Sequence, residues 1–200
     1  MPAVRHLRAA AVTATALLTL FATGAASQAG PRTAAPAPAT SAAVQGTLRC
    51  SLVTAPGQRI TFSPAVTGAT RKISARGSAD LNNCTSPNGR QSRIASGRLT
   101  MAGTAQASCR RASSLSGKGT VTWYAGPNRT GRVLGRSTLA PAPGGTRGYT
   151  AADSFLNGTV VSGLMAHRAY SGSAVPTNNV RRCFSTGVKY LQGRGAFSIR

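Results

Sequence analysis

Apolar residues recur at every second position through most of the chain after residue 45. Leu48, Cys50 and Leu52 alternate with polar neighbours, and the run from Lys72 to Leu81 keeps the same period without interruption. A period of two places successive side chains on opposite faces of a strand, so that one face is apolar and the other polar. The pattern therefore predicts strands that pack on one side only, and not helices.

Clusters of turn-forming residues separate these runs. They are Ala55–Gly57, Ser86–Gly89, Gly126–Asn128 and Pro141–Gly145. The one segment with some helical character, Val161–Tyr170, contains glycine and β-branched residues that disfavour a helix. Short strands with such spacing predict an all-β domain, an antiparallel β-sandwich or barrel of about eight to ten strands.

The stretch Gly117–Tyr124 contains the only tryptophan of the chain. Val121 and Trp123 fall on one face of the predicted strand, and Thr122 and Tyr124 fall on the other. A tryptophan that alternates with valine is typical of a core position, where its ring buries a large apolar area. We expect Trp123 in the core and Tyr124 on the outer face.

Four cysteines are present, Cys50, Cys84, Cys109 and Cys183. An even number in an exported chain indicates two disulfides, whereas a metal site would need close pairs that this chain lacks. Three pairings are possible and the sequence does not choose among them. We adopt the sequential one, Cys50–Cys84 and Cys109–Cys183, with about 3 kcal/mol of stabilisation from each bridge. No metal site and no cofactor is expected.

The first residues have the layout of a secretory signal peptide. Arg5 and Arg8 precede an uncharged run and then small residues, with cleavage expected after Ala26 or Ala29. We assign residues 1–29 to the signal peptide, 30–44 to an Ala/Pro-rich linker and 45–200 to a single β-sandwich domain. The mature protein is expected to be secreted, free or associated with the cell envelope, and to contain no transmembrane segment.

The charge balance is extreme, with 24 Lys and Arg residues against two acids, Asp80 and Asp153. Such a protein attracts polyanions such as cell-wall polymer or nucleic acid without specificity, and salt weakens the attraction. The basic residues are scattered and no nucleic-acid-binding module accompanies them. The candidate polyanion-binding residues are Arg110, Arg111, Arg129, Arg132, Arg136, Arg181 and Arg182.

The same composition offers little for catalysis, and we assign no catalytic residues. Two acids cannot readily supply the paired carboxylates of a glycosidase, and Asp80 falls on the polar face of its predicted strand. A secreted nuclease or toxin that uses His167 with neighbouring arginines is one alternative to a non-enzymatic β-module. A secreted protease inhibitor that presents a loop at Arg110-Arg111 beside Cys109 is another.

Several short motifs resemble those of small, secreted, disulfide-containing β-sandwich proteins of actinobacteria, a group whose function is not established. The motifs are Gly46-Thr47, Thr61–Pro64, Gly119–Trp123, Gly158–Leu164 and the late Cys183 followed by Ser185–Val188. The resemblance covers most of residues 45–200 and implies export and a bridged sandwich. It implies no catalytic residue.

Overall fold

A computed structural model describes residues 48–142, 146–147 and 157–200. The predicted signal peptide and linker, the first residues of the predicted domain and Asp153 lie outside this part. The described residues form these elements: β1 (Leu48–Thr54), β2 (Ile60–Val66), β3 (Arg71–Thr85), β4 (Ser96–Ala107), β5 (Arg111–Tyr124), the short 3-10 helix η1 (Pro127–Arg129), β6 (Val133–Pro141), β7 (Thr146–Arg147), β8 (Gly158–Gly163), β9 (Ala169–Pro176), the short 3-10 helix η2 (Arg181–Phe184), β10 (Val188–Leu191) and β11 (Gly193–Ile199). Val161–Tyr170 forms the end of β8, a turn and the start of β9.

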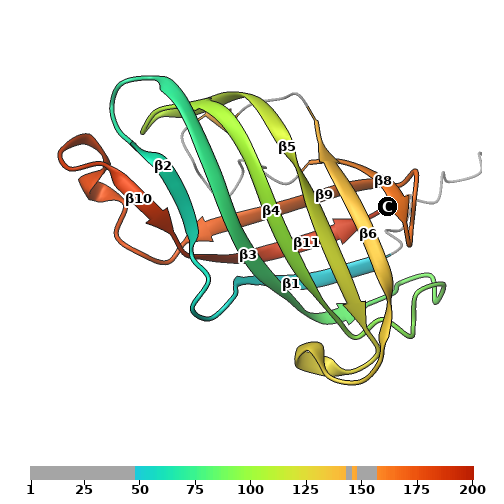
Figure 1. Ribbon diagram of the computed structural model, residues 1–200. Coiled ribbons are helices and arrows are strands. Elements are labelled where there is room, and N and C mark those ends of the chain that lie inside the picture. The colour runs from blue at the N-terminus through green and yellow to red at the C-terminus, as the bar shows by residue number, and fades with distance from the viewer. Residues whose placement is uncertain (1–47, 143–145, 148–156) are drawn as a thin grey trace, which may run out of the picture. The chain divides into compact units, whose positions relative to one another are not determined.

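The strands form an antiparallel barrel, as the alternation predicted (Figure 1). Eight strands follow one another around it in the order β1, β11, β9, β8, β6, β5, β4 and β3, and pairing of β1 with β3 closes the ring. Closure leaves these strands without a free edge, which protects them from pairing with other chains. Of the two architectures considered, the barrel is the one that forms.

Two further strands extend the sheet beyond the barrel. β1 and β2 share one edge of β3, β1 beside its second half and β2 beside Ser74–Arg76, and β10 then pairs with β2. Because β3, β4 and β5 have 15, 12 and 14 residues, longer than most strands, they project past the ring. In Figure 1 this overhang carries β2 and β10 on the left of the barrel.

Alternate side chains fill the barrel as the sequence pattern requires. Leu48, Cys50 and Leu52 of β1 are buried while their neighbours are exposed. Trp123 is fully buried, and its Nε1–H donates a hydrogen bond to Ser137 Oγ of β6 at 2.8 Å. Ser137 in turn donates to the carbonyl oxygen of Leu164, so the one polar atom of the indole has a partner inside the core.

Both predicted disulfides are present. Cys50–Cys84 connects β1 to β3, with Cα atoms 4.1 Å apart, and therefore crosses the pairing that closes the barrel. Cys109–Cys183 connects the β4–β5 turn to η2, with Cα atoms 5.7 Å apart, and therefore fastens the overhang. Each bridge holds together segments that are distant in sequence, with separations of 34 and 74.

The apolar side chains form two separate cores. The first fills the barrel and includes Trp123, Leu99 and Phe197. The second lies under the overhang and contains Val66, Ile73, Ala107, Ala112, Cys183 and Val188. The second disulfide belongs to this smaller core, and a core of so few side chains gains from a covalent bridge.

Candidate functional site

The structure divides the predicted polyanion-binding arginines between the two ends of the β4–β5 hairpin. Arg110, Arg111, Arg181 and Arg182 lie at the overhang, and Arg129, Arg132 and Arg136 lie at or after η1. The 14 residues of β5 separate the two groups, a length of roughly 40 Å at the rise of a strand. The seven residues therefore do not make one site.

The first group, which we call the disulfide-end cluster, consists of Arg110, Arg111, Arg181 and Arg182. Each residue lies within two positions of a cysteine of the Cys109–Cys183 bridge, so the disulfide brings the two arginine doublets together. All four are exposed. Like charges placed together by a covalent bond repel each other, and an anion bound between them relieves that repulsion.

An aromatic side chain contacts one arginine of the disulfide-end cluster. Phe184, the last residue of η2, is 61 % exposed, and the guanidinium carbon of Arg110 lies 5.5 Å from the centre of its ring. The backbone N–H of Cys109 donates to the carbonyl oxygen of Thr67 at 2.8 Å, which fixes the turn against the β2–β3 loop. Arg110 is thus held by a cation–π contact on an anchored turn.

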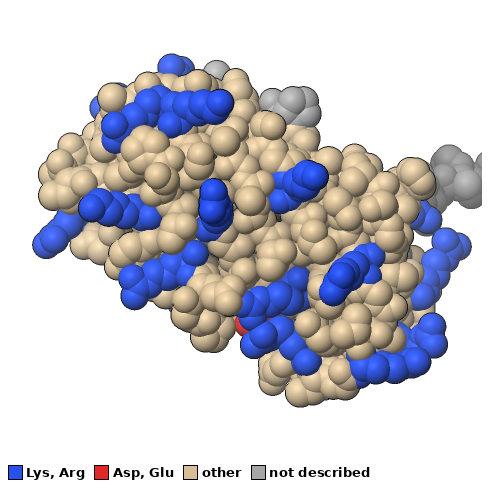
Figure 2. All heavy atoms as spheres, viewed as in Figure 1, with Lys and Arg blue, Asp and Glu red and all other residues tan. Residues whose placement is uncertain are grey.

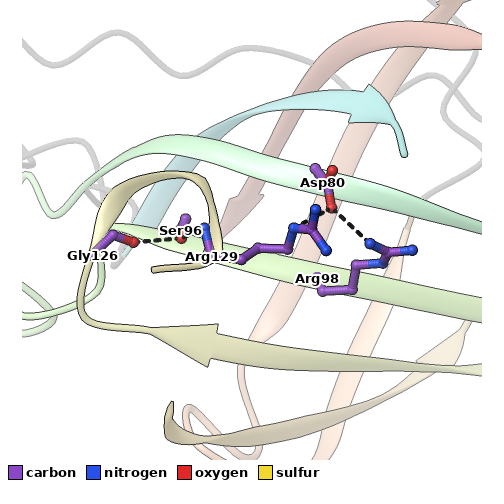
Figure 3. Close-up of polar contacts among 5 residues, drawn as sticks. All are labelled: Asp80, Ser96, Arg98, Gly126 and Arg129. Atoms are coloured by element: carbon purple, nitrogen blue, oxygen red, sulfur yellow. Dashed lines mark hydrogen bonds and ion pairs between the residues drawn. The ribbon is translucent and has the colours of Figure 1, made fainter. Parts of the chain in front are cut away.

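At the opposite end, Ser96 fixes the position of Arg129 (Figure 3). Ser96 Oγ donates to the carbonyl oxygen of Gly126 at 2.6 Å and accepts the backbone N–H of Arg129 at 2.8 Å. These two bonds hold η1 over the end of β4. The Arg129 side chain then lies across β4 with its Nε 3.3 Å from Asp80 Oδ1.

Asp80 differs from its expected place on a solvated polar face, because it is buried. Arg98 and Arg129 cover it, with Arg98 Nη1 3.6 Å and Arg129 Nε 3.3 Å from the same carboxylate oxygen. That oxygen meets no hydrogen-bond geometry, so the contacts are ion pairs without directed bonds. Arg98 and Arg129 both pair with Asp80, the one acidic side chain among the described residues, and together they neutralise its charge.

The other basic side chains are spread widely over the described surface. Figure 2 shows Lys and Arg side chains spread over the visible face, with almost no acidic atoms among them. Arg132 and Arg136 belong to this surface and are both exposed. Apart from the disulfide-end cluster, the described surface is a diffuse positive field.

His167 lies in the tight turn between β8 and β9. Its φ angle of 65° is in the left-handed region, its side chain is exposed, and its backbone N–H donates to the carbonyl oxygen of Val160 at 2.7 Å. Within residues 48–142, 146–147 and 157–200, no three His, Cys, Asp or Glu side chains come together in a way that could hold a metal ion. His167 is not among the described residues that line the apolar cavity between the two cores.

That cavity, of about 500 Å³, lies between the two cores and is a site that the sequence analysis missed. Leu52, Ala79, Leu99, Leu139 and Tyr170 line it from the barrel core. Val66, Ile73, Ala107, Ala112, Cys183 and Val188 line it from the overhang core. The only signal in the sequence is the run of small residues at inward positions of three strands, such as Ala75 in β3, Gly103 in β4 and Gly119 in β5.

Tyr170 contributes its ring to the wall of this cavity. The ring stacks on Phe197 with centroids 5.8 Å apart, and burial raises the pKa of the phenol from its ordinary 10.0 to about 12. Desolvation causes the shift, because a phenolate is costly in apolar surroundings. Tyr170 therefore stays neutral over the whole physiological range and the wall of the cavity stays uncharged there.

No protein-family model, no curated protein and no solved structure matches the chain. In the part of the chain that the structure describes, no helix combines the length and the apolar character that crossing a bilayer requires.

Proposed function

We propose that the protein is an exported, non-enzymatic β-module that associates with phosphate-bearing anionic polymer through its arginines. The observation that carries the proposal is the disulfide-end cluster, in which Cys109–Cys183 holds two arginine doublets together on an exposed end of the molecule. Guanidinium groups are suited to phosphate because they donate in a planar fork. The leader of the chain and its resemblance to exported β-sandwich proteins support export.

The composition supports the same proposal. With a formal net charge of +22, the chain gains electrostatic free energy whenever it neutralises an anionic polymer and releases counterions. The one carboxylate among the described residues is already paired with Arg98 and Arg129 and does not offset this charge. Two polymers with phosphodiester backbones, poly(glycerol phosphate) of the cell-wall type and single-stranded DNA, share the chemistry that the cluster would recognise.

A pair of fourfold variants tests the proposal. In the first, Arg110, Arg111, Arg181 and Arg182 are all replaced by Gln; in the control, the exposed Arg90, Arg93, Arg168 and Arg194 are replaced. Both lose the same charge, so a difference between them reports location. We expect the cluster variant to bind both polymers at least tenfold more weakly than the control at low salt, about 1.4 kcal/mol.

The outcomes separate three accounts. Equal losses in the two variants would mean that the whole basic surface binds and that the cluster has no special part. Tight binding of one polymer and not the other would show that a feature besides phosphate charge decides the partner. Absence of binding to either polymer by the unmodified protein at low salt would refute the proposal.

A further inference from the structure

The cavity between the two cores differs from the gaps that packing normally leaves. Interiors of folded proteins contain few voids larger than a water molecule, yet this one has about 500 Å³ and opens to solvent. Roughly 300 to 1,000 Å³ is the usual volume of a small-molecule site, and eight-stranded barrels are wide enough to hold one small ligand. The volume therefore fits an occupant and exceeds what imperfect packing explains.

The cavity exists because the inward positions of the overhanging strands are too small to fill it. Small residues line the cavity at these positions, whereas inward positions within the ring of the barrel have Leu or Val. The small residues are Ala75, Gly103, Ala105 and Gly119. Gly103 could not be larger, since a Cβ there would clash with the carbonyl oxygen of Ser116 on the neighbouring strand. Backbone packing thus keeps this wall thin, and the space in front of it stays open.

Among the described residues of the lining, charge is found only at the exposed rim of the cavity. Among the described residues that line the cavity, the charged ones are Lys118 of β5 and Arg181 of η2, and both are exposed. They are both cations, and the buried Asp80 does not line the cavity. Phe184 is also part of the lining and is largely exposed. An occupant would therefore meet apolar walls inside and positive charge with an aromatic ring at the entrance.

We infer that the cavity binds a long-chain amphiphile with a single acyl chain and an anionic head group, of the class of a fatty acid. The chain lies between the barrel core and the overhang core, and the carboxylate lies at the mouth beside Lys118 or Arg181. Each methylene removed from water adds to the affinity, while the head group remains partly hydrated at the entrance. Tyr170, kept neutral by burial, does not oppose an anion near the cavity.

The single tryptophan provides a direct test. Trp123 belongs to the same core as Leu99 and Leu139, which line the cavity. The polyene fatty acid cis-parinaric acid absorbs where tryptophan emits and fluoresces strongly only in apolar surroundings. Bound in the cavity of the full-length protein, it should quench Trp123 by energy transfer and gain its own fluorescence with the same saturable dependence on concentration. A linear, unsaturable signal would overturn the inference.

Two neighbouring substitutions locate the site. Ala75→Phe places a ring inside the cavity, whereas Ser74→Phe places the same ring on the exposed face of the same strand. We expect the first to weaken probe binding more than tenfold and the second to leave it unchanged. Ala105→Phe on β4 repeats the test from the adjacent strand, so that one misfolded variant would not decide the outcome. Equal effects of the inward and outward substitutions would contradict the assignment.

The head group is tested by charge. The alcohol with the same polyene chain should bind about threefold more weakly than the acid, because an exposed cation contributes only modestly. Lys118→Gln or Arg181→Gln, and most of all the two together, should reduce that difference, while Lys72→Gln, which alters an exposed lysine outside the lining, should not. Equal affinity of acid and alcohol would remove the anionic head group from the proposal.

The interior of the cavity can be tested separately from polymer binding, although Arg181 and Phe184 lie both at its mouth and at the disulfide-end cluster. Ala75→Phe lies outside the disulfide-end cluster and should leave the affinity for poly(glycerol phosphate) unchanged. Loss of polymer binding in that variant, with the fold intact by circular dichroism, would mean that cavity and cluster form one site and would overturn the separation drawn here.

Discussion

At the scale of single residues, Ser137 is a fully buried polar residue of the barrel core. It accepts the indole N–H of Trp123 and donates to the carbonyl oxygen of Leu164, and the Trp123 and Ser137 side chains are fully buried. Removing its hydroxyl leaves the buried indole N–H and the partly buried carbonyl without their partner.

Ser137→Ala should therefore lower the free energy of unfolding by about 2 kcal/mol, measured by urea denaturation. Ser113→Ala removes the same hydroxyl from an exposed position of β5 and should change it by less than about 0.5 kcal/mol. Equal stability of the two variants would show that water replaces the serine and that the core is not dry at this point.

Tyr170 should make the free energy of unfolding depend on pH above about 10. Its pKa is about 12 in the folded protein against 10.0 in an unfolded chain, so the folded state holds the proton more tightly. The stabilisation is complete below pH 10 and is lost as the pH rises through 12, a change on the order of 2 to 3 kcal/mol. Tyr170→Phe should abolish that part of the alkaline decline in unfolding free energy.

The matched control for this prediction is Tyr190→Phe, which alters a largely exposed ring that lies beside Arg59. It should retain the alkaline decline of the unmodified protein. The same decline in all three proteins between pH 10 and 12 would mean that lysine and other groups cause it, and that Tyr170 is not desolvated in solution.

At the scale of elements, Cys109–Cys183 matters more for the overhang than for the barrel. η2 and β10 contribute to the smaller core, and among the described strands β10 pairs with β2 alone, at the end of the sheet. The bridge closes a loop with a sequence separation of 74 and so constrains the unfolded chain by about 4 kcal/mol. Without it, the overhang should open while the eight strands of the ring stay paired.

Hydrogen exchange of the double variant Cys109→Ala, Cys183→Ala should show this. Backbone amides of η2 and β10 should lose protection, and those of β9 and β11 should keep it. The corresponding double variant at Cys50 and Cys84 is the control and should instead loosen the β1–β3 pairing. A uniform loss of protection in both variants would contradict the division into two cores.

The local elements could be predicted from sequence because their causes are local. The alternation of apolar and polar residues in β1 and β3 predicts strands, and both strands are found. Trp123 shares a strand face with Val121, which predicts a core position, and its side chain is buried. The burial of Asp80 could not be predicted, because it depends on two arginines from other elements. Arg98 lies on the next strand, and Arg129 lies in a distant turn that is held in place by Ser96.

The candidate sites depended still more on contacts that are remote in sequence. The disulfide pairing was chosen as the simplest of three, and it determines that Arg110 and Arg181 are neighbours while Arg129 is not. The cavity was missed because Ala75 and Gly103 look like ordinary strand residues. The open space in front of these two residues becomes visible only in the three-dimensional arrangement of the closed barrel.

At the scale of the whole molecule, the positive charge affects both folding and binding. Arginines without acidic partners repel one another, so the compact state is favoured by whatever brings anions to the surface. The barrel resists this repulsion with a closed ring and two covalent bridges. We interpret the basic exterior and the stabilised interior as two parts of a single adaptation to anionic surroundings.

The salt dependence of polymer binding tests that account most directly. The affinity of the full-length protein for oligothymidylate would be measured over a series of salt concentrations and plotted as log K against log salt. Neutralisation of four phosphates by the disulfide-end cluster predicts that its fourfold Gln variant has a slope shallower by roughly 3 than that of the unmodified protein. A slope near zero for the unmodified protein would contradict the account, because the arginines would then not be in contact with phosphate.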